Sequence, residues 1–266
     1  ASNQMEWITR YIDAESRSPF TTLCKNAASG DREQFPAKSL DAVVTDPPYY
    51  DAIAYADLSD FFYVWLKRTL GRAWPRNFAT PQTPKDEECT ALKHHHEGKI
   101  ALAKAHFEKT LLGIFKAIEH QCAGVVSVMF AHQSTEAWTT LCNSILKANM
   151  NITGSWAIHS EMQGALKTDK AFLESSVTVS CRPQKRSGIG EYKAIRKAIE
   201  KTVREEVRSL YSLGFRGADL LTACFGQAVA EFGRFETVEK ADGSGVSVAE
   251  LLALAREAAF VAIVSD

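Results

Sequence analysis

The sequence lacks the features that define membrane and exported proteins. Among its 266 residues no apolar run reaches the roughly 18 residues that a membrane helix requires. The nearest candidate, Leu251 to Val264, is interrupted by Arg256 and Glu257. Nothing at the N-terminus is typical of a signal peptide. We therefore expect a cytoplasmic protein that does not associate with membranes.

Paired cysteines and an excess of charge of one sign are also absent. The wide spacing of the cysteines argues against a disulfide framework and against a zinc site built on C-x-x-C pairs. The 31 basic and 32 acidic side chains give a net charge of -1, so a nucleic acid could be bound only through a local basic patch. The six cysteines, which we expect to be reduced, are Cys24, Cys89, Cys122, Cys142, Cys181 and Cys224.

What is present is a regular alternation of apolar strands and amphipathic helices. This alternation predicts an α/β sheet with parallel crossovers and helices on its faces. The expected strands are residues 40–45, 125–130, 152–158 and 175–181, and the expected helices are 56–70, 102–120, 135–148, 192–211, 218–232 and 248–264. We expect an α/β domain over residues 1–183, with a polar, Pro-rich insertion at 71–99, followed by a helical region over 184–266.

The first expected helix is rich in aromatic residues. Phe61, Phe62 and Trp65 are a candidate stacking platform for bases, but their helical spacing favours packing in the core. In the insertion, His94, His95 and His96 are consecutive. We expect their side chains to project in different directions and to bind metal ions only adventitiously.

The motif Asp46-Pro47-Pro48-Tyr49 follows the first strand, where α/β enzymes place their sites. Two prolines end the strand and fix the backbone of the loop. An exocyclic amine on adenine or cytosine is a poor nucleophile, because its lone pair is delocalised into the ring. The Asp46 carboxylate and the Pro47 carbonyl can each accept a hydrogen bond from that amine. Two acceptors placed tetrahedrally favour an sp³-like nitrogen, whose lone pair then points toward an electrophile.

Tyr49 could hold the base beside these two acceptors. Its aromatic face can stack on a base rotated out of the duplex, an interaction worth roughly 1–3 kcal/mol. The electrophile would be a methyl sulfonium, attacked in line without a covalent enzyme intermediate.

This motif resembles the hallmark (Asp/Asn/Ser)-Pro-Pro-(Tyr/Phe/Trp) of the methyltransferases that modify adenine N6 or cytosine N4 in DNA. The longer run from Thr45 to Leu66 is similar to the prokaryotic adenine-specific DNA methylases, large proteins that often carry a zinc ribbon and an N-terminal domain of unknown function. The similarity continues at residues 156–161, 175–177 and 181–183, more weakly at 217–220, and it matches only the later part of that family's length.

The resemblance implies a Rossmann-like methyltransferase sheet, S-adenosylmethionine as cosubstrate and DNA as partner, with adenine N6 the preferred acceptor. It implies roles in restriction–modification or phage defence. By the same resemblance, Asp46, Pro47 and Tyr49 are catalytic, and Pro48 shapes the loop. Further along the loop, base-pocket lining and simple loop packing are both open for Tyr50, Asp51 and Tyr55.

The sequence departs from that family in two respects. It lacks the Gly-rich turn after a strand that holds the cosubstrate, and it lacks the zinc-ribbon cysteines. We therefore expect an incomplete sheet, with the cosubstrate strands contributed by a missing N-terminal part of the same protein or by a partner subunit. Asp31 is a candidate ligand for the cosubstrate adenine, although a turn position suits it better. Two alternatives are a non-catalytic nucleic-acid-binding fragment and an amino-methyltransferase acting on RNA or protein.

Overall fold

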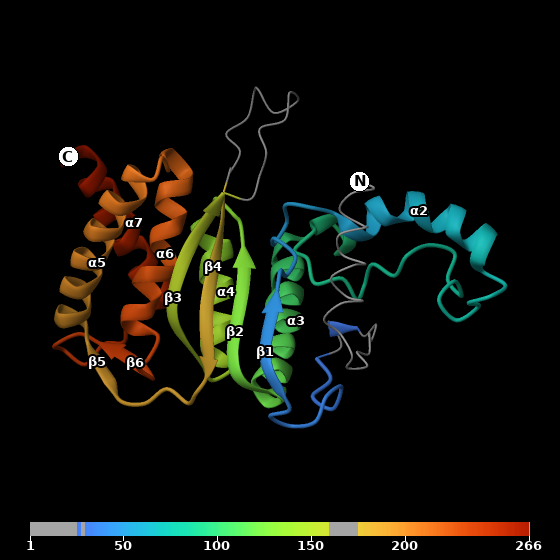
Figure 1. The fold of residues 1–266 in the computed structure, drawn as a ribbon, viewed down its shortest axis with the longest axis horizontal. Coiled ribbons are helices and arrows are strands. Elements are labelled where there is room, and N and C mark those ends of the chain that lie inside the picture. The colour runs from blue at the N-terminus through green and yellow to red at the C-terminus, as the bar shows by residue number, and fades with distance from the viewer. Residues whose placement is uncertain (1–25, 28–29, 160–174, 266) are drawn as a thin grey trace, which may run out of the picture.

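The computed structural model describes residues 26–27, 30–159 and 175–265, and over these residues the chain is an α/β protein (Figure 1). Its main sheet has the strand order β1-β2-β4-β3. The strands are β1 (Leu40–Thr45), β2 (Cys122–Phe130), β3 (Met150–His159) and β4 (Ser175–Pro183). β1 and β2 are parallel, whereas β4 runs antiparallel to both of its neighbours, β2 and β3.

The described residues form six α-helices, which match those expected to within a few residues. A short 3-10 helix, η2 (Lys93–His95), and a second, two-stranded sheet of β5 (Ile189–Glu191) and β6 (Thr237–Glu239) were not expected. The α-helices are α2 (Tyr55–Leu70), α3 (Ile100–Gln121), α4 (Thr135–Lys147), α5 (Tyr192–Ser212), α6 (Gly217–Phe232) and α7 (Val248–Ser265). None of them combines the length and apolar character that a bilayer crossing requires.

The expected parallel crossover is confirmed for β1 and β2, whose connection contains α2 and α3 and is long enough to return the chain to the same end of the sheet. β3 is also parallel to β2, because β4 pairs antiparallel with both of them. The direction of β4 was not predicted by the alternation of strands and helices. β4 follows β3 through residues 160–174, which the structure does not describe and where no helix was expected. Consecutive strands that are not joined by a crossover helix commonly pair in opposite directions.

One face of the sheet is covered by helices. The ring of Phe130 on β2 meets Trp138 on α4 edge to face, with centroids 5.2 Å apart. Ser155 lies on the same face, because the register aligns it with Val179 and Val128. α6 approaches so closely there that a Cβ at Gly226 would collide with the Ser155 side chain. The core therefore lies between the sheet and its helices.

The opposite face is more open, contrary to the expected helices on both faces. Val44 on β1 is 83% exposed and Trp156 on β3 is 60% exposed. The register places both side chains on the face away from Phe130 and Ser155. The two sheet edges also differ: Gln227 of α6 donates to the Ser155 carbonyl along the β3 edge, whereas β1 pairs with β2 alone among the described strands.

The C-terminal helices are not a separate body. α5, α6 and α7 pack on one another, and α6 also contacts β3 and β4 while α7 contacts α4. One continuous cluster of buried residues includes both Phe130 of the sheet and Leu252 of α7. The boundary expected near residue 183 therefore separates two segments of the chain that share a core.

α2 extends away from the sheet (Figure 1), and three of its aromatic residues lie at the surface. Phe61, Phe62 and Trp65 are 68%, 64% and 57% exposed, so the expectation of core packing was wrong. Among the described residues the helix interacts mainly with the insertion, where the buried Tyr63 donates its hydroxyl hydrogen to the Thr80 carbonyl at 2.7 Å. Because the insertion covers only part of α2, the other apolar side chains of the helix remain at the surface.

Candidate functional site

The motif Asp46-Pro47-Pro48-Tyr49 lies at one edge of the sheet, where the carboxyl ends of β1 and β2 meet the start of β4. The register pairs Thr45 with Val128, and Phe130 with Val177. Residues that directly follow β1 and β2, and residues that begin β4, therefore lie close together although they are far apart in the sequence.

Asp46 and Tyr49 form the centre of the site. Asp46 is exposed and Tyr49 is half-buried. The Tyr49 hydroxyl interacts with the Asp46 carboxylate and with Ser176. Burial and then the Asp46 carboxylate raise the pKa of Tyr49 well above its usual range, so the hydroxyl keeps its proton. Its ring meets Phe130 edge to face, with centroids 5.7 Å apart. The exposed carboxylate is thus oriented by a tyrosine that is itself anchored to the sheet.

The two prolines shape the backbone beside this carboxylate. Pro47 is buried and Pro48 is half-buried. The turn is closed by the Tyr50 N–H, which donates to the Pro48 carbonyl, and by the Ala52 N–H, which donates to the Tyr49 carbonyl. Among the described residues, no donor uses the Pro47 carbonyl. This carbonyl is held by two fixed proline rings and keeps its capacity to accept a hydrogen bond.

Tyr55, at the start of α2, joins the site. The Tyr49 backbone N–H donates to the Tyr55 hydroxyl, and burial followed by the Asp46 charge raises the pKa of Tyr55. Tyr55 is 38% exposed, so part of its ring remains open to a ligand. The expected position of Tyr55 beside the motif therefore agrees with the structure, and its role in binding a base stays a prediction.

Tyr50 and Asp51 turn away from Asp46. Tyr50 is only 7% exposed, and its ring packs against Phe107 and His132 at centroid distances of 5.1 and 5.8 Å. Burial raises the pKa of Tyr50 to about 12. Its φ of 57° lies in the left-handed region, which turns the side chain toward the core. Tyr50 has the position expected for loop packing, because a ring with so little exposure offers no face to a base.

His132 was missed in the sequence and lies beside the motif, in the loop that follows β2. Its Nε2 is 3.2 Å from Oδ1 of Asp51, and its Nδ1 accepts from the Ser134 N–H at 3.0 Å. The second contact leaves the proton of a neutral ring on Nε2, which donates to Asp51. The available signal was its place after a buried strand parallel to β1.

Asp31 lies near the amino end of the parallel strands, away from Asp46. Its side chain accepts from the Glu33 N–H at 2.8 Å, which is the turn role considered in the sequence. Its carbonyl accepts from Gln121, the last residue of α3, next to the start of β2. A strand rises by about 3.3 Å per residue, so the length of β1 separates Asp31 from the motif.

The described site therefore contains the exposed Asp46 carboxylate, a neighbouring backbone carbonyl that accepts no hydrogen bond from the described residues, and two tyrosines whose hydroxyls lie against the same loop. Two acceptors and aromatic surface suit a planar ligand with an NH₂ group. No protein-family model matches the sequence, and the search of curated proteins found none that matches.

Proposed function

We propose that this chain contains the amine-polarising site of an S-adenosylmethionine-dependent DNA amino-methyltransferase that prefers adenine N6. The observation that supports this function is the exposed Asp46 carboxylate, oriented by the Tyr49 hydroxyl at the carboxyl edge of the sheet. The motif's resemblance to adenine-specific DNA methylases supports the choice of acceptor.

In this mechanism one amine hydrogen of a flipped base is donated to Asp46 and the other to the Pro47 carbonyl. S-adenosylmethionine, when bound, would supply an electrophilic methyl group. Asp46 and Pro47 draw the amine hydrogens out of the plane of the base, so the nitrogen lone pair becomes available to attack that methyl carbon in line. The C–N bond would form as the C–S bond breaks, S-adenosylhomocysteine would leave, and one amine proton would pass through the exposed Asp46 carboxylate to solvent. Tyr49 orients Asp46 through its hydroxyl and offers the exposed part of its ring to the base.

The cosubstrate strands are proposed to pair with the open edge of β1. Among the described strands, β1 has a neighbour on one side only, and Val44 is almost fully exposed. Parallel strands are usually covered on both faces, so this part of the sheet has the surface that an additional layer would cover. Another part of the same protein or a partner subunit would provide it.

The test is methyl transfer from radiolabelled S-adenosylmethionine by the full-length product of the gene, with DNA, RNA and protein as parallel acceptors. We expect transfer to DNA, and a loss of at least about a hundredfold in Asp46→Ala, comparable to the removal of one transition-state hydrogen bond. Because Asp46 is an exposed loop residue, circular dichroism should show an unchanged fold. The matched control is Asp41→Ala, an exposed carboxylate near the other end of β1.

Each other outcome contradicts part of the proposal. Wild-type rates in Asp46→Ala would remove Asp46 from the mechanism. Transfer to RNA or protein but not to DNA would change the acceptor. DNA binding without transfer to any acceptor would identify a non-catalytic nucleic-acid-binding protein.

A further inference from the structure

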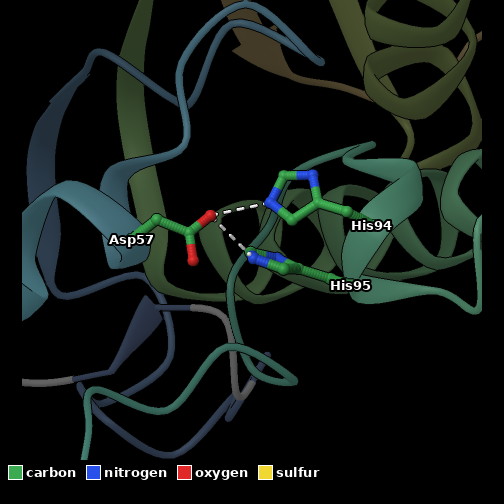
Figure 2. Close-up of side chains that lie close together, drawn as sticks. All are labelled: Asp57, His94 and His95. Atoms are coloured by element: carbon green, nitrogen blue, oxygen red, sulfur yellow. Dashed lines mark hydrogen bonds and ion pairs between the residues drawn. The ribbon is translucent and has the colours of Figure 1, made fainter.

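Three side chains from two distant segments converge beside the start of α2 (Figure 2). The Nε2 atoms of His94 and His95 lie 2.7 and 3.0 Å from the same Oδ2 atom of Asp57. The ligand atoms of the three residues all lie within 4.8 Å of one another. The expectation that these histidines project in different directions was wrong for this pair, because η2 places them so that both rings face Asp57.

His95 is held by carboxylates on both sides of its ring. Its side chain is only 6% exposed, with Nε2 toward Asp57 and Nδ1 3.7 Å from Oε2 of Glu88. Glu88 is itself fixed, because it accepts from the Ala56 N–H at 2.8 Å and from the Thr90 hydroxyl at 3.3 Å. A neutral imidazole carries one N–H and cannot donate to both carboxylates. With a cation on Nε2, the N–H lies on Nδ1 and faces Glu88; protonation of the ring is the other state in which both nitrogens suit their carboxylates.

That arrangement is common around protein-bound metals. A ligating histidine usually directs its other ring nitrogen to a carboxylate or carbonyl, which fixes the tautomer. The other oxygen of Asp57, Oδ1, lies 3.9 Å from Nζ of Lys85, which is already bound to Asp60 at 2.6 Å. Oδ2 is therefore the oxygen left to the two imidazoles.

The spacing also suits a first-row divalent ion. With ligand bonds of about 2.0–2.2 Å, neighbouring ligand atoms lie about 3.3–3.6 Å apart in a tetrahedral site and about 2.8–3.1 Å apart in an octahedral one. The Asp57–His94 and Asp57–His95 distances of 2.7 and 3.0 Å are close to the octahedral value and somewhat shorter than the tetrahedral one, so small ring rotations would admit an ion. Imidazole with a carboxylate favours zinc and its neighbours over calcium or magnesium.

We propose that Asp57, His94 and His95 form a site for one Zn²⁺-type divalent ion, oriented by Glu88. The ion would join η2 to the first turn of α2, two residues after Tyr55. Segment 83–88 already wraps this turn, where the Thr83 hydroxyl donates to the Ala56 carbonyl. Metal binding would thus stabilise the contact between the insertion and the loop after the Asp46 motif, whether or not that motif transfers methyl groups.

The experiment is calorimetric titration of Zn²⁺ into the chain after dialysis against a chelator. We expect one ion per chain, with the affinity weakened at least about tenfold in Asp57→Ala and in His95→Ala. His94→Ala should weaken binding as well, and since this side chain is 55% exposed, it is the variant least able to disturb folding. The matched control is His96→Ala, from the same run of histidines, because the His96 ring lies against His106 instead. It should bind within about twofold of wild type.

Two results would overturn the site. Absence of stoichiometric uptake by the wild type would show that the three side chains are joined by hydrogen bonds alone. Equal losses in His95→Ala and His96→Ala, with none in Asp57→Ala, would show adventitious chelation by the histidine run. Circular dichroism of every variant, and a rise in thermal midpoint with Zn²⁺ that is lost in His94→Ala, separate lost ligation from lost folding.

Discussion

Tyr49 links the exposed and the buried parts of the candidate site. Its hydroxyl meets Asp46 and Ser176, while its ring rests on Phe130 in the core. A side chain fixed at both ends loses little further freedom when a ligand arrives, so the carboxylate it orients is already positioned. In the proposed mechanism the hydroxyl and the ring would therefore have separable effects, one on the orientation of Asp46 and one on the base.

Two substitutions at Tyr49 should separate those effects. Tyr49→Phe keeps the ring and removes a hydrogen bond to a charged group, so we expect kcat to fall about tenfold with KM for DNA nearly unchanged. Tyr49→Ala also removes the stacking surface, so KM should rise by about 5- to 150-fold, corresponding to the ~1–3 kcal/mol of a stacked base. Steady-state kinetics of the full-length gene product measures both. If Tyr49→Phe raised KM as much as Tyr49→Ala, the ring would have no separate role.

For single residues, the sequence predicted the candidate residues of one loop but not the side chains from distant segments that contact such residues. Asp46 and Tyr49 could be singled out because they belong to one short motif of consecutive residues. His132 is 81 residues from Asp51, and His94 is 37 residues from Asp57. Such contacts depend on strand order and on the path of the insertion, and neither follows from the spacing of residues in the chain.

Among the elements, α2 differs most from its pattern. Apolar residues at helical spacing predicted a buried stripe, yet Phe61 and Trp65 lie at the surface. The insertion contacts the helix through Tyr63, and its later part enters the core at Cys89 and Leu92. Periodicity defines a helix and its apolar face, but it does not identify the neighbour that would cover that face.

Truncating the exposed aromatic residues of α2 should therefore cost little stability. Phe61→Ala and Trp65→Ala should each change the free energy of unfolding by less than about 1 kcal/mol, because each removes only a surface contact, the edge-to-face pair of Phe61 with Phe62 or the contact of Arg68 with Trp65. Phe107→Ala, at a fully buried position of α3, should cost about 3–5 kcal/mol. Urea unfolding followed by circular dichroism measures all three. A loss above about 1.5 kcal/mol for Phe61→Ala would show that α2 packs against another part of the chain.

The other α-helices and the strands of the main sheet were predicted well because their boundaries have local causes, whereas the short elements η2, β5 and β6 were not predicted. The paired prolines end β1, and Ser134 accepts from the Ala137 N–H at the start of α4. The direction of β4 has no such local cause. It depends on how the chain returns after β3, so the sequence pattern did not predict it.

At the scale of the whole molecule, the two edges of the main sheet differ: among the described residues, the β3 edge is covered by a helix and the β1 edge is not. α6 lies along β3, and Gln227 bonds to the β3 backbone, which protects that edge from pairing with another strand. At the other edge, β1 has no second partner among the described residues, and Val44 and Trp156 leave apolar surface on the open face. That further strands belong at this edge, as the missing Gly-rich turn led us to expect, stays a prediction.

Val44→Arg tests whether another layer covers this face. In the present chain, the free energy of unfolding should change by less than about 0.5 kcal/mol, since an exposed side chain loses no packing. If the cosubstrate layer covers β1 in the full-length product, the same change would bury an unpaired charge there and should weaken S-adenosylmethionine binding at least about tenfold. The control is Ile189→Arg, an exposed apolar residue on β5, which should bind normally in the same calorimetric titration. Equal affinity of Val44→Arg and wild type would mean that no cosubstrate layer covers the β1 face in the full-length protein.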